Sequence, residues 1–484
     1  MPLLERFQKS SSHRNAWAVE SRASVLDCGS PLLLYTAGAA MKKRQRAAAV
    51  QNLAESPHRF SILATAFIKP LKHTGRISFD DSRVLRHNND MSDFRRNRTG
   101  HKTAEAPAGV ALPGLPEKII TAASRENPAD RVLREELKAQ PDIMPSDATA
   151  VVQTVFNYFR WRGWLDLTGP LNLQIRKARE LARNFAEAPE TFSDASLVER
   201  VVPEWIRAEL EISPAWARAI QAEPKLWLRA KPEQGMALVE HLGAAKLEKN
   251  LLPDAVQYKG EEDLFRRDEF HAGEFEIQDI ASQAVGWLCA PQPGETWWDA
   301  CAGEGGKMLH LSALMHNKGL IWASDRSEWR LKNLKRRAAR AQVFNFRAAL
   351  WNGGAKLPTK TKFDGVLVDA PCSGVGTWQR NPHARWTTTP ADVQELSALQ
   401  KDLLANVAPS VKPGGKLIYT VCTLTRSETD AVVADFNSRC PDFEPLELPK
   451  ISESLPTPGA AKTIWPQDLG GNGMFIAAWR KKKV

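Results

Sequence analysis

The spacing of hydrophobic and polar residues divides the chain into regions of different character. Residues 1–115 keep no regular apolar spacing and mix basic clusters with Ser, Asn, Gly and Pro. This composition predicts a disordered basic arm, either a solvated tail or an RNA-binding segment; a start placed too far upstream and an organelle transit peptide stay open as alternatives. Residues 116–232 repeat apolar residues every three or four positions, which predicts a helical module. A transitional region follows over residues 233–272.

The helical module is rich in tryptophan. Such residues usually anchor the core of a small helical bundle, and base stacking on RNA is the less favoured alternative. The tryptophans concerned are Trp161, Trp164, Trp205, Trp216 and Trp227.

Residues 273–484 alternate short apolar runs with helical stretches. This alternation is typical of βαβ units around a parallel sheet, so an α/β domain is expected. A long amphipathic helix is predicted between the third and fourth apolar runs. The five runs predicted as strands are Thr296–Cys301, Gly319–Asp325, Phe363–Pro371, Lys416–Thr423 and Met474–Trp479.

Charge and cysteine content narrow the environment and the partners. Lysine and arginine number 66 against 56 acidic residues, a net charge of +10. A polyanion such as RNA or DNA is therefore a natural partner, although charge alone leaves a role without nucleic acid equally open. The six cysteines form no Cys-x-x-Cys pair, so no metal site is expected, and they favour a reduced, cytoplasmic chain. No apolar run reaches the roughly eighteen residues that a membrane span requires, so no membrane partner is expected.

A glycine-rich turn, DACAGEGGK, follows the first predicted strand over residues 299–307. Its glycines allow backbone amides to approach a ligand closely at a helix N-terminus. A Walker phosphate loop and a dinucleotide fingerprint are both excluded, because Met308 stands where each requires another residue. Asp325 ends the second predicted strand and is placed to accept hydrogen bonds from ribose hydroxyls. A nucleoside-type ligand is expected, although a structural tight turn explains the glycines alone equally well.

Two cysteines, Cys372 and Cys422, each follow an apolar strand pattern. A thiolate adds reversibly to C6 of a pyrimidine and makes C5 nucleophilic toward a methyl donor. Asp369 stands three residues before Cys372, where a carboxyl group beside the ring would bind N3 and the exocyclic amine. Release of the methylated product requires loss of the C5 proton and of the thiol, which gives a second thiol or a base a role. The alternative is that both cysteines are small buried residues at strand ends, and these residues alone do not order the two thiols.

Five segments in a fixed order resemble the Sun/RsmB-type family of RNA cytosine-C5 methyltransferases, which use S-adenosylmethionine. The resemblance implies an α/β fold, a Rossmann-like methyltransferase domain with a mostly parallel seven-stranded sheet, preceded by an all-α module of the RNA-binding type. It implies methyl transfer to C5 of a cytosine, and the helical module indicates the ribosomal RNA branch. The segments are GEFEIQDIASQ (273–283), DACAGEGGK (299–307), SDRSEWRLKNLKRRAAR (324–340), DAPCSGVGTWQRNPHARW (369–386) and PGGKLIYTVCTLTRSE (413–428).

The resemblance also implies which residues form the site. Cys422 becomes the nucleophile that adds to C6, and Cys372 becomes the thiol that assists product release. Asp369 and Lys307 are expected to face the target base. A monomer without a metal is expected. The residues expected to hold S-adenosylmethionine are Cys301, Ala302, Gly303, Glu304, Gly305, Gly306, Lys307, Asp325 and Asp369.

The chain departs from the family pattern mainly around the expected cofactor. Proline is usual where Glu304 stands, and threonine is usual where Met308 and Val421 stand. The family offers an acid toward the adenine after its third strand, where this chain has only Asn352; His383 stands where Asp is common. The alternatives kept open are a transfer RNA substrate, a catalytically weak RNA-binding assembly factor on the same fold, and methyl transfer to DNA or protein.

Overall fold

The computed structural model describes residues 114–455 and 459–483. The basic arm expected over residues 1–115 therefore lies almost entirely outside the described residues. Within the described part of the chain, no helix is long and apolar enough to cross a membrane.

The first described region is a bundle of helices. Helix α5 shows why these residues fold in this way, because its apolar positions recur at three and four and its buried face includes Val151, Val155 and Phe159. The α-helices are α3 (Leu115–Ala122), α4 (Ala129–Lys138), α5 (Pro145–Arg160), α6 (Leu171–Glu187), α7 (Asp194–Arg200) and α8 (Pro214–Gln221), with short 3-10 turns between them. Serine side chains cap α7 and α8 by accepting hydrogen bonds from the first-turn amides.

The tryptophans of this region belong to the core, as expected. Trp161 and Trp216 are fully buried with Phe185 in one apolar cluster, and Trp164 and Trp205 pack against it half-buried. Trp378 of the later α/β region joins the same cluster and lies 6.4 Å from Trp216 between ring centroids. Buried rings cannot present their faces to bases, so the stacking alternative loses its support for the buried members.

A small antiparallel sheet includes most of the stretch that the sequence pattern left as transitional. Its first strand lies at Leu226–Ala230, inside the region 116–232 that was predicted to be helical, so the helical module ends earlier than expected. Its strand order is β2-β3-β1-β4, and α9 (Gly235–Leu242) packs beside β2. Its strands are β1 (Leu226–Ala230), β2 (Ala245–Leu247), β3 (Ala255–Tyr258) and β4 (Phe275–Ile277), and the short helix α10 (Asp268–His271) precedes β4. Trp227 of β1 is buried in the main core, so this sheet is continuous with the domain that follows.

The main sheet confirms the expected mostly parallel α/β fold. Strands run in the order β10-β12-β9-β8-β5-β6-β7, which gives the expected seven, and β11 adds an eighth by pairing with β12. The strands from β7 to β9 are parallel to one another, and β12 pairs antiparallel with β9 and β10. The strands are β5 (Thr296–Asp299), β6 (Leu320–Asp325), β7 (Phe346–Leu350), β8 (Phe363–Asp369), β9 (Val411–Val421), β10 (Phe443–Pro445), β11 (Ala461–Ile464) and β12 (Met474–Lys481).

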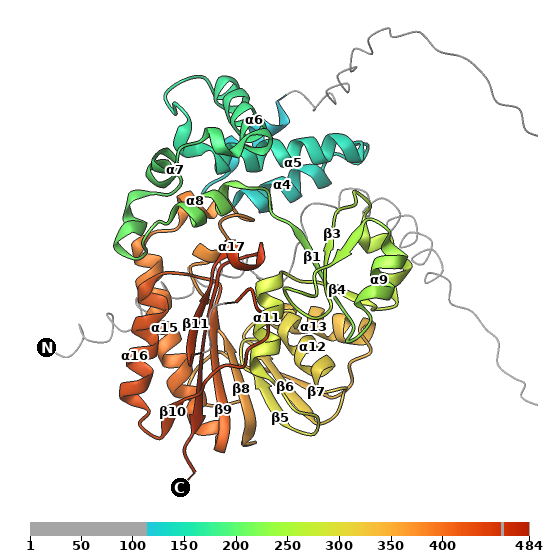
Figure 1. Ribbon diagram of the computed structural model, residues 1–484, viewed down its shortest axis with the longest axis vertical. Helices are drawn as coiled ribbons and strands as arrows, with labels where there is room; N and C mark the ends of the chain where they lie inside the picture. The colour runs from blue at the N-terminus through green and yellow to red at the C-terminus, as the bar shows by residue number, and fades with distance from the viewer. Residues whose placement is uncertain (1–113, 456–458, 484) are drawn as a thin grey trace, which may run out of the picture. The chain divides into compact units, whose positions relative to one another are not determined.

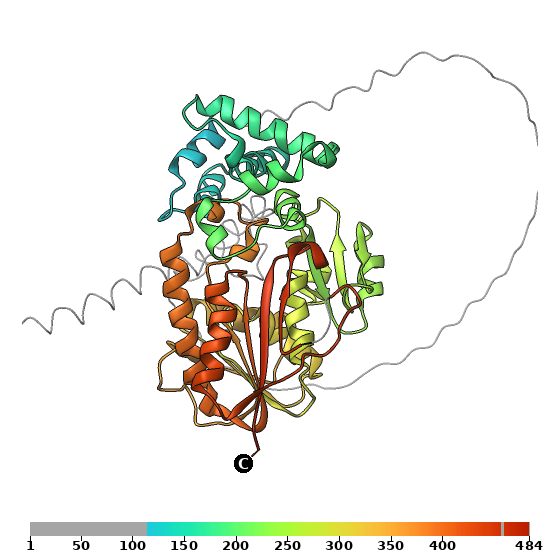
Figure 2. The ribbon, with the colours of Figure 1, turned by 60° about the vertical axis from the view of Figure 1, so that its left-hand side comes forward.

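Helices cover this sheet on both faces, with α15 and α16 on one side and α11, α12 and α13 on the other (Figures 1 and 2). Helix α15 is the amphipathic helix predicted from the sequence, and a capping box formed by Thr389 and Asp392 fixes its start. The helices are α11 (Ile280–Cys289), α12 (Gly306–Leu314), α13 (Glu328–Arg340), α14 (Ala384–Thr387), α15 (Pro390–Val407), α16 (Asp430–Arg439) and α17 (Pro466–Leu469).

One fully buried arginine, Arg385 of α14, joins the helical bundle to the α/β domain. Its Nη1 donates to Gln221 Oε1 at 2.7 Å, to the Val201 carbonyl at 3.1 Å and to the Arg160 carbonyl at 3.3 Å. Its Nη2 donates to the Ile220 carbonyl at 2.8 Å and to the carbonyl of Trp378, in the α/β domain, at 3.2 Å. The pKa of Arg385 is lowered to about 9, mainly by burial and to a smaller extent by the positive charge of Arg160. The guanidinium is therefore still charged at neutral pH.

Candidate active site

The two cysteines singled out from the sequence meet at the carboxyl edge of the main sheet. Strands β8 and β9 are parallel and pair Asp369 with Thr420, so Cys372 and Cys422 both follow the ends of adjacent strands. Their sulfur atoms lie 3.3 Å apart, and both residues are buried, with exposed fractions of 6% and 4%. Parallel pairing thus brings together two residues that are 50 positions apart in the chain.

Lys307 and Asp369 form an ion pair at the same edge. Lys307 lies in the first turn of α12, and its Nζ is 2.7 Å from Asp369 Oδ2. The Lys307 side chain is buried while that of Asp369 is about one quarter exposed, at 24%. The carboxylate is therefore the member of the pair that faces solvent, which is the arrangement expected of a group that meets a substrate.

The glycine-rich turn closes around Asp325, the last residue of β6. The Gly303 amide donates to Asp325 Oδ2 at 3.1 Å, and the Ser327 amide donates to Oδ1 at 2.8 Å. Gly303 and Gly305 have φ angles of 54° and 88°, in the left-handed region that favours glycine. A side chain at Gly305 would in addition bring a Cβ within 2.8 Å of Leu334 Cγ. Asp325 thus holds the turn itself, which sequence reasoning had not foreseen.

The remaining residues of the expected cofactor set are placed by the same turn. Cys301 is a free cysteine, and the Ala302 amide donates to the Ser324 carbonyl at 2.8 Å. Glu304 accepts a hydrogen bond from Asn333 Nδ2 of α13 at 3.1 Å. At Gly306, an added Cβ would meet no atom closer than 3.5 Å, so space remains above the start of α12.

Asn352 makes a hydrogen bond within its own loop. Its Oδ1 accepts a hydrogen bond from the Gly354 amide at 3.1 Å, which closes a local turn after β7. The side-chain oxygen is therefore engaged within its own loop.

A buried carboxylate, Glu428, links the loops that carry the two cysteines. Its Oε1 accepts from the Ser373 amide at 2.9 Å and from Gln400 Nε2 at 3.0 Å. Its Oε2 accepts from Thr425 Oγ1 at 2.8 Å, from Thr423 Oγ1 at 3.2 Å and from Ser373 Oγ. Ser373 follows one cysteine and Thr423 follows the other, and their hydroxyl oxygens lie 2.8 Å apart.

Sequence reasoning assigned no role to Glu428 or to Asp299, although both lie in the quoted motifs. Asp299 ends β5 and is fully buried; burial, and next the negative charge of Asp369, raise its pKa to about 8. Burial raises the pKa of Glu428 as well, against the five hydrogen bonds that stabilise its charged form. A signal was present in both cases, namely an acidic residue within an otherwise apolar or hydroxyl-rich segment.

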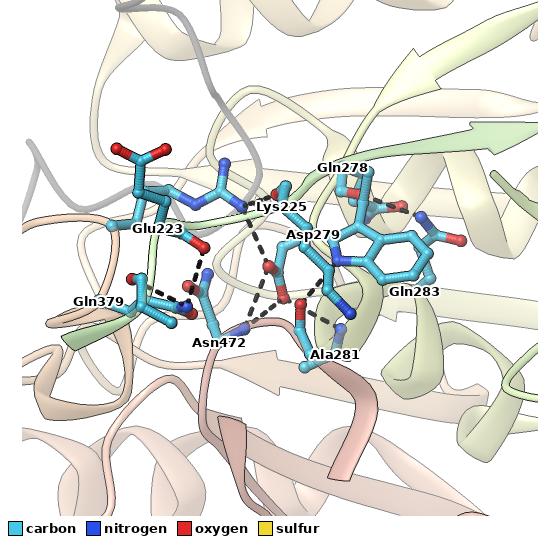
Figure 3. A network of polar contacts seen from close by, with 12 residues as sticks. Glu223, Lys225, Gln278, Asp279, Ala281, Gln283, Gln379 and Asn472 are labelled. Atoms are coloured by element: carbon cyan, nitrogen blue, oxygen red, sulfur yellow. Dashed lines mark hydrogen bonds and ion pairs between the residues drawn. The ribbon is translucent and has the colours of Figure 1, made fainter. Parts of the chain in front are cut away.

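A second network fixes the wall beside the site (Figure 3). Asp279, at the start of α11, accepts from the Ala281 amide at 3.0 Å and from the Asn472 amide at 3.1 Å, and it pairs with Arg380 at 3.2 Å. Gln379 donates to the Glu223 carbonyl at 3.4 Å. The loop after Cys372 is thereby tied to α11, to the approach to β12 and to the segment before β1.

Comparison with known proteins gives the family. The family model described as "16S rRNA methyltransferase RsmB/F" matches residues 286–480. The chain is 33% identical over 360 residues to the "Probable ribosomal RNA small subunit methyltransferase B" of Synechocystis sp., a match that covers 69% of this chain and 79% of that relative. The chain belongs to the RsmB/F family of 16S rRNA methyltransferases.

One further relative agrees with membership of the RsmB/F family, and one solved structure supports the fold. The protein of the same printed name from Bacillus subtilis is 38% identical over 220 residues, which cover 44% of this chain and 49% of that relative. The crystal structure of PH0851 superposes with a TM-score of 0.62 at 22% identity, covers 73% of this chain and 95% of that one, and supports the fold.

This RsmB/F chain is therefore an S-adenosylmethionine-dependent rRNA cytosine methyltransferase, as the sequence resemblance implied. The glycine turn fits such a cofactor, because Gly303 and Gly305 already hold left-handed conformations and Gly306 leaves open space. No group of three or more side chains suited to a metal ion occurs among the residues that the structure describes.

Proposed function

We propose that this protein methylates C5 of a cytosine in 16S rRNA through a covalent bond between Cys422 and C6 of the base. The observation that carries the proposal is the 3.3 Å separation of the Cys372 and Cys422 sulfur atoms at the sheet edge where Lys307 pairs with Asp369. A lone buried cysteine would be explained by packing. Two cysteines in contact, at a sheet edge that also carries the Lys307–Asp369 ion pair, supply the groups that attack and release require.

The attack begins at the Cys422 thiolate, so it requires the reduced form of this residue. A bond forms between its sulfur and C6, and the electrons of the C5–C6 double bond make C5 nucleophilic. As the adduct forms, N3 takes up a proton from water, which it returns when the adduct breaks down. Asp369 accepts hydrogen bonds from this N3–H and from the exocyclic amine, and Lys307, 2.7 Å away, compensates the carboxylate charge. The 301–307 turn and Asp325 would hold S-adenosylmethionine, which would supply the methyl group to C5 and leave as S-adenosylhomocysteine.

Release then requires the C5 proton to leave to a base and the C6–sulfur bond to break, which restores the double bond and the Cys422 thiolate. We propose that Cys372 assists this step. Burial, and next the negative charge of Glu428, raise the pKa of Cys372, so it stays a thiol at neutral pH. A protonated Cys372 can donate a hydrogen bond to the departing sulfur 3.3 Å away.

The test is methyl transfer from labelled S-adenosylmethionine, with a reductant present, to unmodified small-subunit rRNA and in parallel to bulk transfer RNA. Nucleoside analysis should find the label as 5-methylcytosine in the rRNA alone. Cys422→Ala should abolish transfer while cofactor binding, followed by calorimetry, is retained. Full activity of Cys422→Ala would end this mechanism. Label in transfer RNA would show that transfer RNA is a substrate and would contradict the rRNA assignment.

We also infer that the protein acts as a monomer in the cytoplasm. The proposed attack needs the free thiol of Cys422, and a reducing compartment keeps such thiols free. Light scattering coupled to size-exclusion chromatography should give the mass of one chain, and a stable dimer would contradict the inference.

A further inference from the structure

Glu428 is more deeply buried than a structural acid normally is. The residue has no exposed surface, and its carboxylate accepts hydrogen bonds from five donors of four residues. Removing a carboxylate from water costs several kcal/mol, and neutral hydroxyl and amide donors offset this only in part. An apolar residue would fill the space between the loops without that cost, so burial of a charge here points to a role other than packing.

The donors to Glu428 come from both sides of the active site. Ser373 gives its amide and its hydroxyl from the position after Cys372, and Thr423 gives its hydroxyl from the position after Cys422. Each cysteine is therefore one residue away from a direct bond to the same carboxylate. With donors on both sides, a shift of either loop breaks at least one hydrogen bond to Glu428.

A second layer holds the carboxylate in place. Gln400 of α15 donates both to Glu428 Oε1 at 3.0 Å and to the Pro371 carbonyl at 2.8 Å. The Tyr419 hydroxyl oxygen lies 3.0 Å from Gln400 Oε1 and 2.7 Å from the Glu428 carbonyl oxygen, and these two acceptors share its one proton. Gln400 of α15 thus hydrogen-bonds both the segment that begins the Cys372 loop and the strand that leads to Cys422.

We propose that Glu428 is a positioning residue that holds the Cys372 and Cys422 loops so that the two sulfur atoms stay at the separation used in attack and release. The proposal rests on the mechanism given above. The hydrogen bonds of the Glu428 carboxylate go to Ser373, Thr423, Thr425 and Gln400 and not to either sulfur. Glu428 therefore positions the two sulfur atoms through the loops that carry them.

The charge of Glu428 gives the proposal a second measurable consequence. After burial, this charge is the largest influence that raises the pKa of Cys372. Removing it lowers the pKa of Cys372, so this thiol loses its proton at a lower pH. If Cys372 acts while protonated, the decline of kcat on the alkaline side should begin at a lower pH in Glu428→Gln than in the wild type.

The experiment compares Glu428→Gln with wild type in steady-state methyl transfer across pH. A misplacement of about 1 Å can cost on the order of 10²-fold in rate, so a loss of about that size in kcat is expected. The KM for RNA and the affinity for S-adenosylhomocysteine should be unchanged, because neither binding surface includes Glu428. Glu428→Asp keeps the charge and should recover part of the rate together with the wild-type alkaline limb.

Val432→Ala is the matched structural control. Val432 is fully buried in the main core on the next helix, so the variant loses stability without removing a donor or the charge. It should keep the wild-type kcat. Should Glu428→Gln fail to fold, Ser373→Ala and Thr425→Ala each remove one side-chain donor, and each should lower kcat with KM unchanged.

The outcomes separate this inference from the mechanism beneath it. Wild-type kcat and pH profile in Glu428→Gln, with Cys422→Ala inactive, overturn the role of Glu428 alone. Equal losses in Glu428→Gln and Val432→Ala also overturn it, because the effect would then follow stability. An active Cys422→Ala variant would instead remove the proposed function.

Discussion

Replacing Arg385 with methionine should destabilise the protein strongly, because this side chain connects two regions through buried hydrogen bonds. The guanidinium donates hydrogen bonds to Gln221, Ile220 and Val201 of the helical bundle at 2.7 to 3.1 Å, and to two further carbonyls at 3.2 and 3.3 Å. Methionine fills a similar apolar volume but donates nothing, so five buried acceptors lose a donor.

The magnitude follows from these contacts. A hydrogen bond to a charged group contributes about 1.5–3 kcal/mol, but the buried guanidinium also has to lose its hydration shell. Taking the three shorter bonds at about 1 kcal/mol each and the two longer ones together as about 1 kcal/mol gives a net loss of about 4 kcal/mol. A loss of this size is at the upper end of what single substitutions cause.

Urea unfolding followed by far-ultraviolet circular dichroism measures the free energy of unfolding for wild type, Arg385→Met and Arg385→Lys. Lysine keeps the charge but cannot reproduce the two-nitrogen fork that reaches Gln221 and Ile220 together, so it should recover less than half of the loss. A change below about 1 kcal/mol in Arg385→Met would refute the reasoning, since that is the size expected of a substitution with no special mechanism.

Three further results are expected. Cys372→Ala should accumulate a covalent protein–RNA adduct that survives a denaturing gel, because the Cys422 sulfur is released slowly; absence of the adduct counts against the release role. Gly305→Ala should weaken cofactor binding in calorimetry, because a φ of 88° costs a non-glycine residue about 1–3 kcal/mol and the new Cβ meets Leu334; unchanged affinity would contradict this. Burial, and next the charge of Arg162, lower the pKa of His383 to about 4, so the unfolded chain takes up a proton from about pH 6.5 downward while the folded chain does not. Stability should therefore fall by up to about 3 kcal/mol between pH 6.5 and 4, and His383→Gln should flatten that slope in thermal melts; an unchanged slope would exclude this origin.

The strands that carry the active site were predictable because they are buried on both faces. Strands β8 and β9 read as nearly continuous apolar runs, and parallel pairing then places Cys372 and Cys422 at one edge. Strand β7 was missed because it lies at the sheet edge and none of its residues is fully buried, so it shows no apolar run.

The polar residues that organise the junction and the site were not predictable in the same way. Arg385 is buried by carbonyls that lie between 7 and 225 positions away in the chain. Glu428 gains its role only when β8 and β9 bring Ser373 and Thr423 together, 50 positions apart. Neither contact leaves a periodic pattern in the sequence, because the partners are distant along the chain and meet only in the folded protein.

The departures from the family pattern have a physical explanation in the same structure. Met308, which stands in place of threonine, lies in the first turn of α12 and is fully buried in the core, so its longer side chain fills apolar volume. Glu304, which stands in place of proline, is held by Asn333 on α13. Both substitutions are absorbed by the helices that support the turn, while Gly303 still donates to Asp325 at 3.1 Å. The cofactor site can therefore keep its backbone geometry although its sequence has changed. The unusual residues thus give no support to the alternative of a catalytically weak RNA-binding assembly factor.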